Sequence, residues 1–237
     1  GGWSDTVAEK KTDKDTFFMI NGPDSGNLDP QQNGLIVGIQ IEKHIFDTLI
    51  VKDDITGEFK PGLATSWEWT DDTHLKLTLR EGVKFHNGED FTSEDVLKTV
   101  SRFATGAATA ALYDTFSYED SSANGDYEVT IGFTAPFAPA LNYLAHTRAA
   151  IVPADYLEEN GEQALYQNPI GTGAYAFDYW NIGSDTQLVR NDDWWGKAEG
   201  YGDCYFKYIH IPHTSELNVR SIALEAGELD LALNPEE

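Results

Sequence analysis

The side chains of this 237-residue chain that could do chemistry are six histidines, one cysteine and 40 carboxylates. Imidazole, thiolate and carboxylate groups bind metals or catalyse reactions when their spacing brings several of them together. The closest histidines, His210 and His213, are separated by Ile211 and Pro212, and the other four are scattered. No spacing matches a zinc site or a facial triad, so the sequence predicts neither a metal site nor a cofactor.

Motifs of hydrolytic enzymes are absent from the sequence. It contains no Gly-x-Ser-x-Gly elbow, no HExxH helix and no Ser-x-x-Lys nucleophile pair. Acidic pairs such as Glu158-Glu159 are adjacent, whereas glycosidase carboxylates come from different elements that face one another. We therefore expect no catalytic residues. A secreted hydrolase acting on peptides or glycans stays open as an alternative, without a candidate nucleophile.

Two short segments resemble ion-binding loops, but each lacks residues that such a loop requires. Gly171-Thr172-Gly173 lacks both the GxxxxGK[ST] pattern and the following Lys of a phosphate loop. Residues 51–57 resemble half of a calcium loop, but they lack the alternating ligand positions and the terminal Glu. We predict a hairpin turn at residues 51–57.

The charge of the chain excludes several kinds of partner. The net charge of −24 and the pI of about 4.3 disfavour nucleic-acid binding and charge-driven docking on an anionic membrane. No run approaches the roughly 18 apolar residues that span a bilayer. A single cysteine, Cys204, allows no intramolecular disulfide, and we expect it to pack within a strand. Residues 1–15 are polar and predict a flexible tether that follows a removed export signal.

The elements that must position these residues are predicted from hydrophobic periodicity. Alternating apolar residues, as in Leu75, Leu77 and Leu79, indicate strands over 75–79, 127–133 and 229–233. A short apolar run before a turn indicates a strand over 16–20, and 187–190 and 205–211 are also predicted to be strands. Apolar residues at helical spacing indicate helices over 36–49 and 141–145. A capping box at Thr92 and Asp95 predicts the start of a third helix, and a fourth is predicted from Ser215 to a cap at Gly227. Because strands and helices mix without regular βα repetition, the predicted class is α+β.

Six blocks follow one another along the chain in a characteristic order. They are Leu28-Asp29-Pro30, residues 61–67 (PGLATSW), 79–88 (LREGVKFHNG), 171–175 (GTGAY), 190–195 (RNDDWW) and 226–230 (AGELD). Together they resemble the extracellular solute-binding proteins of family 5, the peptide/nickel substrate-binding proteins of bacterial ABC importers. The family usually has Pro where this chain has Ala174, and its glycine block lets the chain turn sharply beside a sheet.

The resemblance implies the first lobe of a two-lobed periplasmic-binding-protein-like fold (class II or cluster C), with a mixed sheet and flanking helices. Residues 16–45 and 165–237 would form the core of this lobe, which is incomplete without a C-terminal return of the chain. Residues 46–164 would form an outlying subdomain. The second lobe would lie outside this sequence.

The resemblance also implies where a ligand would bind. Asn33, Gly34, Leu35 and Ile36 would lie at the cleft edge, where an extended ligand pairs with main-chain groups. The alternative is an ordinary loop before a helix. Tyr113 would face the cleft as an aromatic that stacks on a ligand and offers a hydroxyl, the alternative being a packed tyrosine.

The implied function is capture of peptides outside the cell and their delivery to an ABC transporter permease, by closure of two lobes on the ligand. Within the family, a sugar, a metal chelate or a signalling peptide are alternative cargoes. The implied location is extracytoplasmic, at the cell surface as a lipoprotein or in the periplasm, with a lipid-anchor cysteine that this sequence lacks. Because the second lobe carries most charged ligand contacts in the family, we expect weak or no peptide binding by this chain alone.

Overall fold

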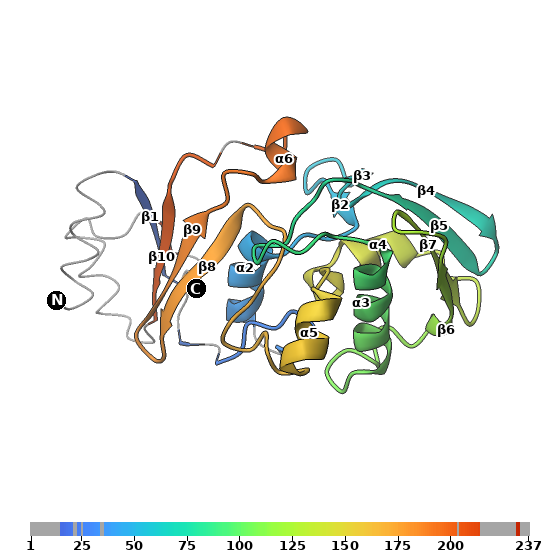
Figure 1. Ribbon diagram of the computed structural model, residues 1–237, viewed down its shortest axis with the longest axis horizontal. Helices are drawn as coiled ribbons and strands as arrows, with labels where there is room; N and C mark the ends of the chain where they lie inside the picture. The colour runs from blue at the N-terminus through green and yellow to red at the C-terminus, as the bar shows by residue number, and fades with distance from the viewer. Residues whose placement is uncertain are drawn as a thin grey trace.

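Two sheets with flanking helices form the computed structural model, which describes residues 15–20, 23–24, 26–33, 36–202, 204–213 and 231–232 (Figure 1). The first sheet has the strand order β11-β1-β10-β9-β8. Its strands are β1 (Thr16–Ile20), β8 (Tyr175–Asn181), β9 (Asp185–Arg190), β10 (Tyr208–Pro212) and β11 (Leu231–Ala232). β1 lies parallel to both β10 and β11, whereas β8, β9 and β10 pair antiparallel. This sheet is therefore mixed, as predicted.

The second sheet is antiparallel, with the order β4-β5-β7-β6. Its strands are β4 (Ala64–Asp71), β5 (His74–Leu79), β6 (Phe116–Ala123) and β7 (Glu128–Phe133). Leu75, Leu77 and Leu79 are buried, which confirms the half-buried strand that their alternation predicts. A separate hairpin joins β2 (Ile50–Lys52) to β3 (Phe59–Pro61), and Gly57 takes a φ of 73° in its turn. The turn predicted at residues 51–57 is confirmed.

The helices are α2 (Ile36–Ile45), α3 (Ser93–Thr105), α4 (Ala140–Ala145), α5 (Ala154–Asn160) and α6 (Trp195–Ala198), with a short 3-10 turn, η1 (Thr147–Ala149). The predicted capping box begins α3. The Thr92 hydroxyl accepts from the Glu94 N–H, and the Asp95 carboxylate accepts from the Thr92 N–H at 2.8 Å. These bonds satisfy donors that the first helical turn leaves free.

Two hydrophobic clusters lie under the two sheets. The first contains α3 and the four-stranded sheet, with buried residues between Leu49 and Ile151. The second packs the five-stranded sheet against α2, and Leu157 of α5 and Leu165 belong to it. The predicted subdomain limits, 16–45 with 165–237 and 46–164, stay a prediction.

The structure corrects two local expectations. The helix predicted over 36–49 ends at Ile45, because the carbonyl oxygens of Ile45 and Asp47 accept hydrogen bonds from the backbone N–H groups of Gly173 and Ile151 instead. The strand predicted over 205–211 starts at Tyr208 instead. Cys204, which was expected to pack within a strand, therefore lies outside one and is half-buried.

Several predicted elements lie outside the described residues: positions 1–14 of the tether and the helix from Ser215 with its cap at Gly227. Among the residues that the structure does describe, none of the helices is long and apolar enough to cross a membrane.

Candidate functional site

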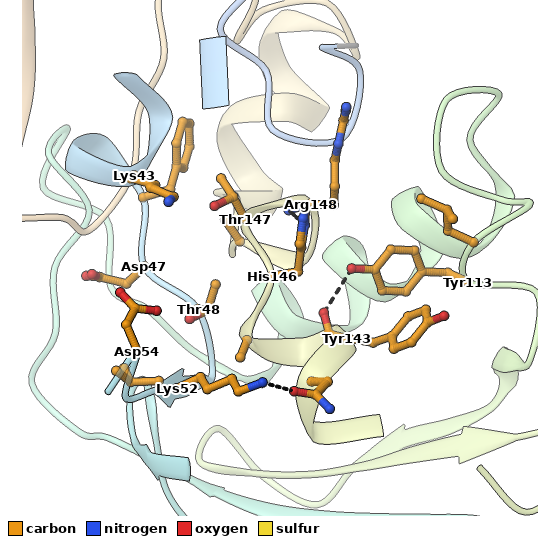
Figure 2. A pocket seen from close by; sticks show the side chains of 16 residues that line it. Lys43, Asp47, Thr48, Lys52, Asp54, Tyr113, Tyr143, His146, Thr147 and Arg148 are labelled. Atoms are coloured by element: carbon orange, nitrogen blue, oxygen red, sulfur yellow. Dashed lines mark hydrogen bonds between the residues drawn. The ribbon is translucent and has the colours of Figure 1, made fainter. Parts of the chain in front are cut away.

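A cavity of about 740 Å³ draws its walls from both hydrophobic clusters. One wall is the C-terminal half of α2 with the segment that continues into β2, and the other is α4 with η1 (Figure 2). Leu112 and Tyr113, which follow α3, close a third side. A cavity of this size, partly apolar with a few polar groups, suits a small organic ligand or part of a larger one.

Tyr113 forms part of the aromatic wall of this cavity. Its hydroxyl donates to the Tyr143 carbonyl oxygen at 2.9 Å (Figure 2). The centroid of its ring lies 4.4 Å from the ring centroid of Phe103 and 5.4 Å from that of Tyr143. The side chain is 2% exposed, and burial raises the pKa of the phenol. The structure therefore places the predicted residue at the cavity with its donor hydrogen already used inside the protein.

Basic side chains line the same cavity. Lys43 comes from α2, Lys52 from β2, and His146 and Arg148 from the turn around η1 (Figure 2). Lys52 reaches across to α4, where its ammonium donates to the Asn142 side chain at 2.9 Å. Burial and the positive charges of Arg148 and Lys43 lower the pKa of His146.

Asp47 lies two residues beyond the end of α2, and it joins two of the sequence blocks. Its Oδ2 accepts hydrogen bonds from the Thr172 hydroxyl at 2.8 Å, from the Trp195 indole at 2.8 Å and from the Trp194 indole at 3.2 Å. Burial raises the pKa of Asp47, although these bonds favour the ionised form. The carboxylate therefore fixes the GTG and DDWW blocks against the cavity wall.

The glycines of the GTG block are required by close packing on α2. A β-carbon at Gly171 would lie 2.2 Å from the Ile45 carbonyl oxygen, and one at Gly173 would lie 2.5 Å from that of His44. The Gly173 N–H donates to the Ile45 carbonyl at 2.8 Å, which satisfies one of the free acceptors at the end of this helix. The block was expected to turn beside a sheet, and the contact found here is with the helix C-terminus.

The Leu28-Asp29-Pro30 block is tied to α3 by a buried ion pair. Asp29 and Arg102 are 0% and 7% exposed, and the guanidinium contacts both carboxylate oxygens, at 3.1 Å through Nη1. Gln31 extends the network, since its amide donates to the carbonyl oxygens of Arg148 and Ala150. Removing one partner of such a buried pair lowers the free energy of unfolding by about 3–5 kcal/mol. The pair therefore holds residues 28–30 in position against α3.

Asn33, predicted at the cleft edge, directs its side chain inward. Its amide donates to Oε1 of the Glu42 carboxyl group at 2.9 Å. Glycine at position 38 leaves space for this side chain, because a β-carbon there would lie 1.6 Å from the Asn33 amide nitrogen. Gly34 and Leu35 lie outside the described residues, and Ile36 begins α2. The predicted ligand role of the 33–36 backbone stays a prediction.

The sequence had not singled out Lys43, Asp47 or Arg148. None of them belongs to a recognisable motif, and 105 positions separate Lys43 from Arg148, so only the fold brings them to one cavity. No group of three metal-ligating side chains occurs within the described ranges.

Residues 58–237 match the model of a family described as "Bacterial extracellular solute-binding proteins, family 5 Middle". The chain belongs to this family. Its members are solute-binding proteins and not enzymes, which confirms the predicted resemblance and overturns the hydrolase alternative.

Relatives of this family 5 protein are similar to it in sequence along most of its length. Protein XP55 of Streptomyces lividans is 32% identical over 81% of the chain, and the periplasmic oligopeptide-binding protein OppA of Salmonella typhimurium is 25% identical over 94%. The periplasmic binding protein DppA of Helicobacter pylori, solved in complex with the peptide STSA, superposes with a TM-score of 0.81 at 26% identity over 95% of the chain. The periplasmic-binding-protein-like fold is thereby confirmed.

The family 5 chain spans 34% of XP55, 44% of OppA and 48% of the DppA chain. It therefore corresponds to between one third and one half of the length of these relatives.

Proposed function

We propose that the chain is part of the substrate-binding component of an ABC importer, and that it captures peptides outside the cell for delivery to a membrane permease. The observation that carries the proposal is the family match together with the peptide named in the DppA complex. Secreted hydrolysis has no support, because the family consists of binding proteins.

The geometry supports binding of an extended ligand next to the 740 Å³ cavity. Asp29 is held by Arg102, and the Gln31 amide donates at 3.0 Å to the carbonyl oxygen of Arg148, which lines the cavity. Main-chain groups at Asn33, Gly34, Leu35 and Ile36 would pair with the ligand backbone, and a ligand side chain would enter the cavity beside Tyr113.

The rest of the proposed site would lie in a second lobe. The relatives are more than twice as long as the part that this chain matches, which leaves room for such a lobe. Closure would then follow from contacts that the ligand makes with both lobes only in the closed state. We propose an extracytoplasmic location, and a lipid anchor upstream of the polar residues 1–15 as the tie to the membrane.

Native mass spectrometry of the full-length protein, purified without denaturation, tests this function. We expect a series of co-purified masses that fit short peptides. One non-peptide mass would assign the protein to another cargo, such as a sugar or a metal chelate. Protein without ligand that also ignores added peptides would contradict the proposal.

A further inference from the structure

Asn33 is the residue of the proposed ligand-binding segment 33–36 whose side chain the structure describes. The residue is 2% exposed, and its backbone N–H donates to the Asp29 carbonyl oxygen at 2.9 Å. Its side-chain amide is directed into the protein, toward Glu42. A ligand in this place would therefore meet the main chain of Asn33 and not its side chain.

The partner of the Asn33 amide is a fully buried carboxyl group. Glu42 lies on α2 and is 0% exposed, and its Oε1 accepts from the amide at 2.9 Å. Its Oε2 is buried as well and has no hydrogen-bond partner among the residues that the structure describes. Because a buried carboxyl group is costly unless it is hydrogen-bonded, Asn33 offsets part of the cost of placing Glu42 here.

Gly38 provides the space for this contact. It lies on α2, four residues before Glu42, and a β-carbon there would lie 1.6 Å from the amide nitrogen and 2.7 Å from the Cγ of Asn33. Any other residue at position 38 would therefore displace the Asn33 side chain. Glycine destabilises the interior of a helix relative to alanine, and the contact with Asn33 accounts for its presence.

Charged groups of two other segments act on Glu42. Burial raises the pKa of Glu42 to about 8, and the negative charge of Asp29 acts in the same direction. The Asn33 hydrogen bond and the positive charge of Arg148, in η1, oppose this shift. Asp29 is itself paired with Arg102 of α3. At pH 7 the carboxyl group is therefore mostly protonated, and it accepts from Asn33 without a buried charge.

We propose that the Asn33–Glu42 contact positions the main chain of residues 33–36 for the captured peptide, and that Glu42 and Gly38 are positioning residues of the binding site. Strand addition needs backbone donors and acceptors in register, so a displaced Asn33 would move groups that pair with the peptide. The inference rests on the proposed function, and it assigns an effect on affinity to side chains that the peptide would not touch.

Calorimetric titration of the full-length protein with one short peptide tests the inference through a double-mutant cycle. Gly38→Ala should displace the Asn33 amide and Asn33→Ala should remove it, and each should weaken binding about two- to tenfold, the range of one hydrogen bond. The double variant should bind no more weakly than either single variant, because the new β-carbon then occupies space that the amide has left. Ile41→Val, which removes one buried carbon from the same helix, is the control that lowers stability without changing affinity.

The pH dependence of affinity separates a positioning role from a merely structural one. Ionisation of Glu42 above pH 8 places a charge in a buried site, and a bound peptide that covers the loop makes ionisation less favourable still. Binding should therefore favour the protonated form, and wild-type affinity should fall severalfold between pH 7 and pH 9. Glu42→Gln keeps the acceptor for Asn33 and cannot ionise, so it should retain wild-type affinity at pH 7 and lose less of it at pH 9.

Wild-type affinity in Gly38→Ala, or effects of the two alanine substitutions that multiply in the double variant, would overturn the inference and leave the proposed function standing. The same pH profile in wild-type protein and in Glu42→Gln would overturn the role of Glu42. Failure of the wild-type protein to bind any peptide would overturn the proposed function and the inference with it.

Discussion

Glu42 is a buried carboxyl that holds the predicted ligand loop. It is 0% exposed, and its Oε1 accepts from the Asn33 amide. Burial raises the pKa of Glu42 from 4.5 to about 8, although the Asn33 bond and the charge of Arg148 act in the opposite direction. Folded protein therefore keeps this proton at pH values where the unfolded chain releases it. The free energy of unfolding should fall as pH rises through this window.

Replacement of Glu42 by Gln should remove this pH dependence while keeping an acceptor for Asn33. The useful range lies between pH 7 and 8, where His44 stays neutral in the folded protein because burial lowers its pKa to about 4. Burial raises the pKa of Asp95 to about 7, so Asp95 also titrates in this range, but it does so in both proteins and cancels in the comparison. Wild-type protein should lose roughly 1 kcal/mol of unfolding free energy there, and the variant much less. Urea unfolding at both pH values measures the difference; equal slopes would contradict the assignment.

Single residues at the site were only partly predictable. Tyr113 was placed near the ligand by resemblance, and the structure puts it at the cavity, although its buried hydroxyl has an internal partner. Lys43 and Arg148 carry no local pattern, because only the fold brings these two residues to the lining of one cavity.

At the scale of elements, the contact between the GTG block and α2 makes a sharp prediction. Gly173→Ala should destabilise the protein by about 2–4 kcal/mol, because the new β-carbon would lie 2.5 Å from the His44 carbonyl oxygen and backbone must move. Gly57→Ala is the matched control, since its β-carbon meets nothing and the cost is about 1 kcal/mol from its φ of +73°. Thermal and urea unfolding compare the two variants.

If Gly173→Ala proved no more destabilising than Gly57→Ala, the helix end would have room to shift, and the close approach would not constrain the fold. Full-length protein is the appropriate material, because both variants are then compared in the same background.

Elements with a local cause were predicted best. The capping box starts α3 at the expected residue, and the alternation of Leu75, Leu77 and Leu79 gives β5. The end of α2 was missed because it depends on hydrogen bonds to Ile45 and Asp47 from Gly173 and Ile151, which lie far along the chain. Nothing near β1 in the sequence indicates that it lies between β10 and β11.

At the scale of the whole molecule, the proposed division of the binding site between two lobes predicts a difference in affinity. The 237-residue chain should bind peptides weakly or not at all, whereas the full-length protein should bind them tightly, because a half-site leaves most of the ligand in water. Calorimetry on both forms with one peptide gives the comparison. Tight, saturable binding by the shorter chain would show that the described cavity and loop suffice.

The position of β1 has a consequence for how the protein is made. Residues 16–20 lie between strands formed by residues 208–212 and 231–232, so the ribosome must pass residue 208 before this strand has either neighbour. The four-stranded sheet, by contrast, is complete in sequence by Phe133. During synthesis this apolar strand would therefore stay unpaired after the four-stranded sheet is complete, an interval in which a chaperone can bind the chain.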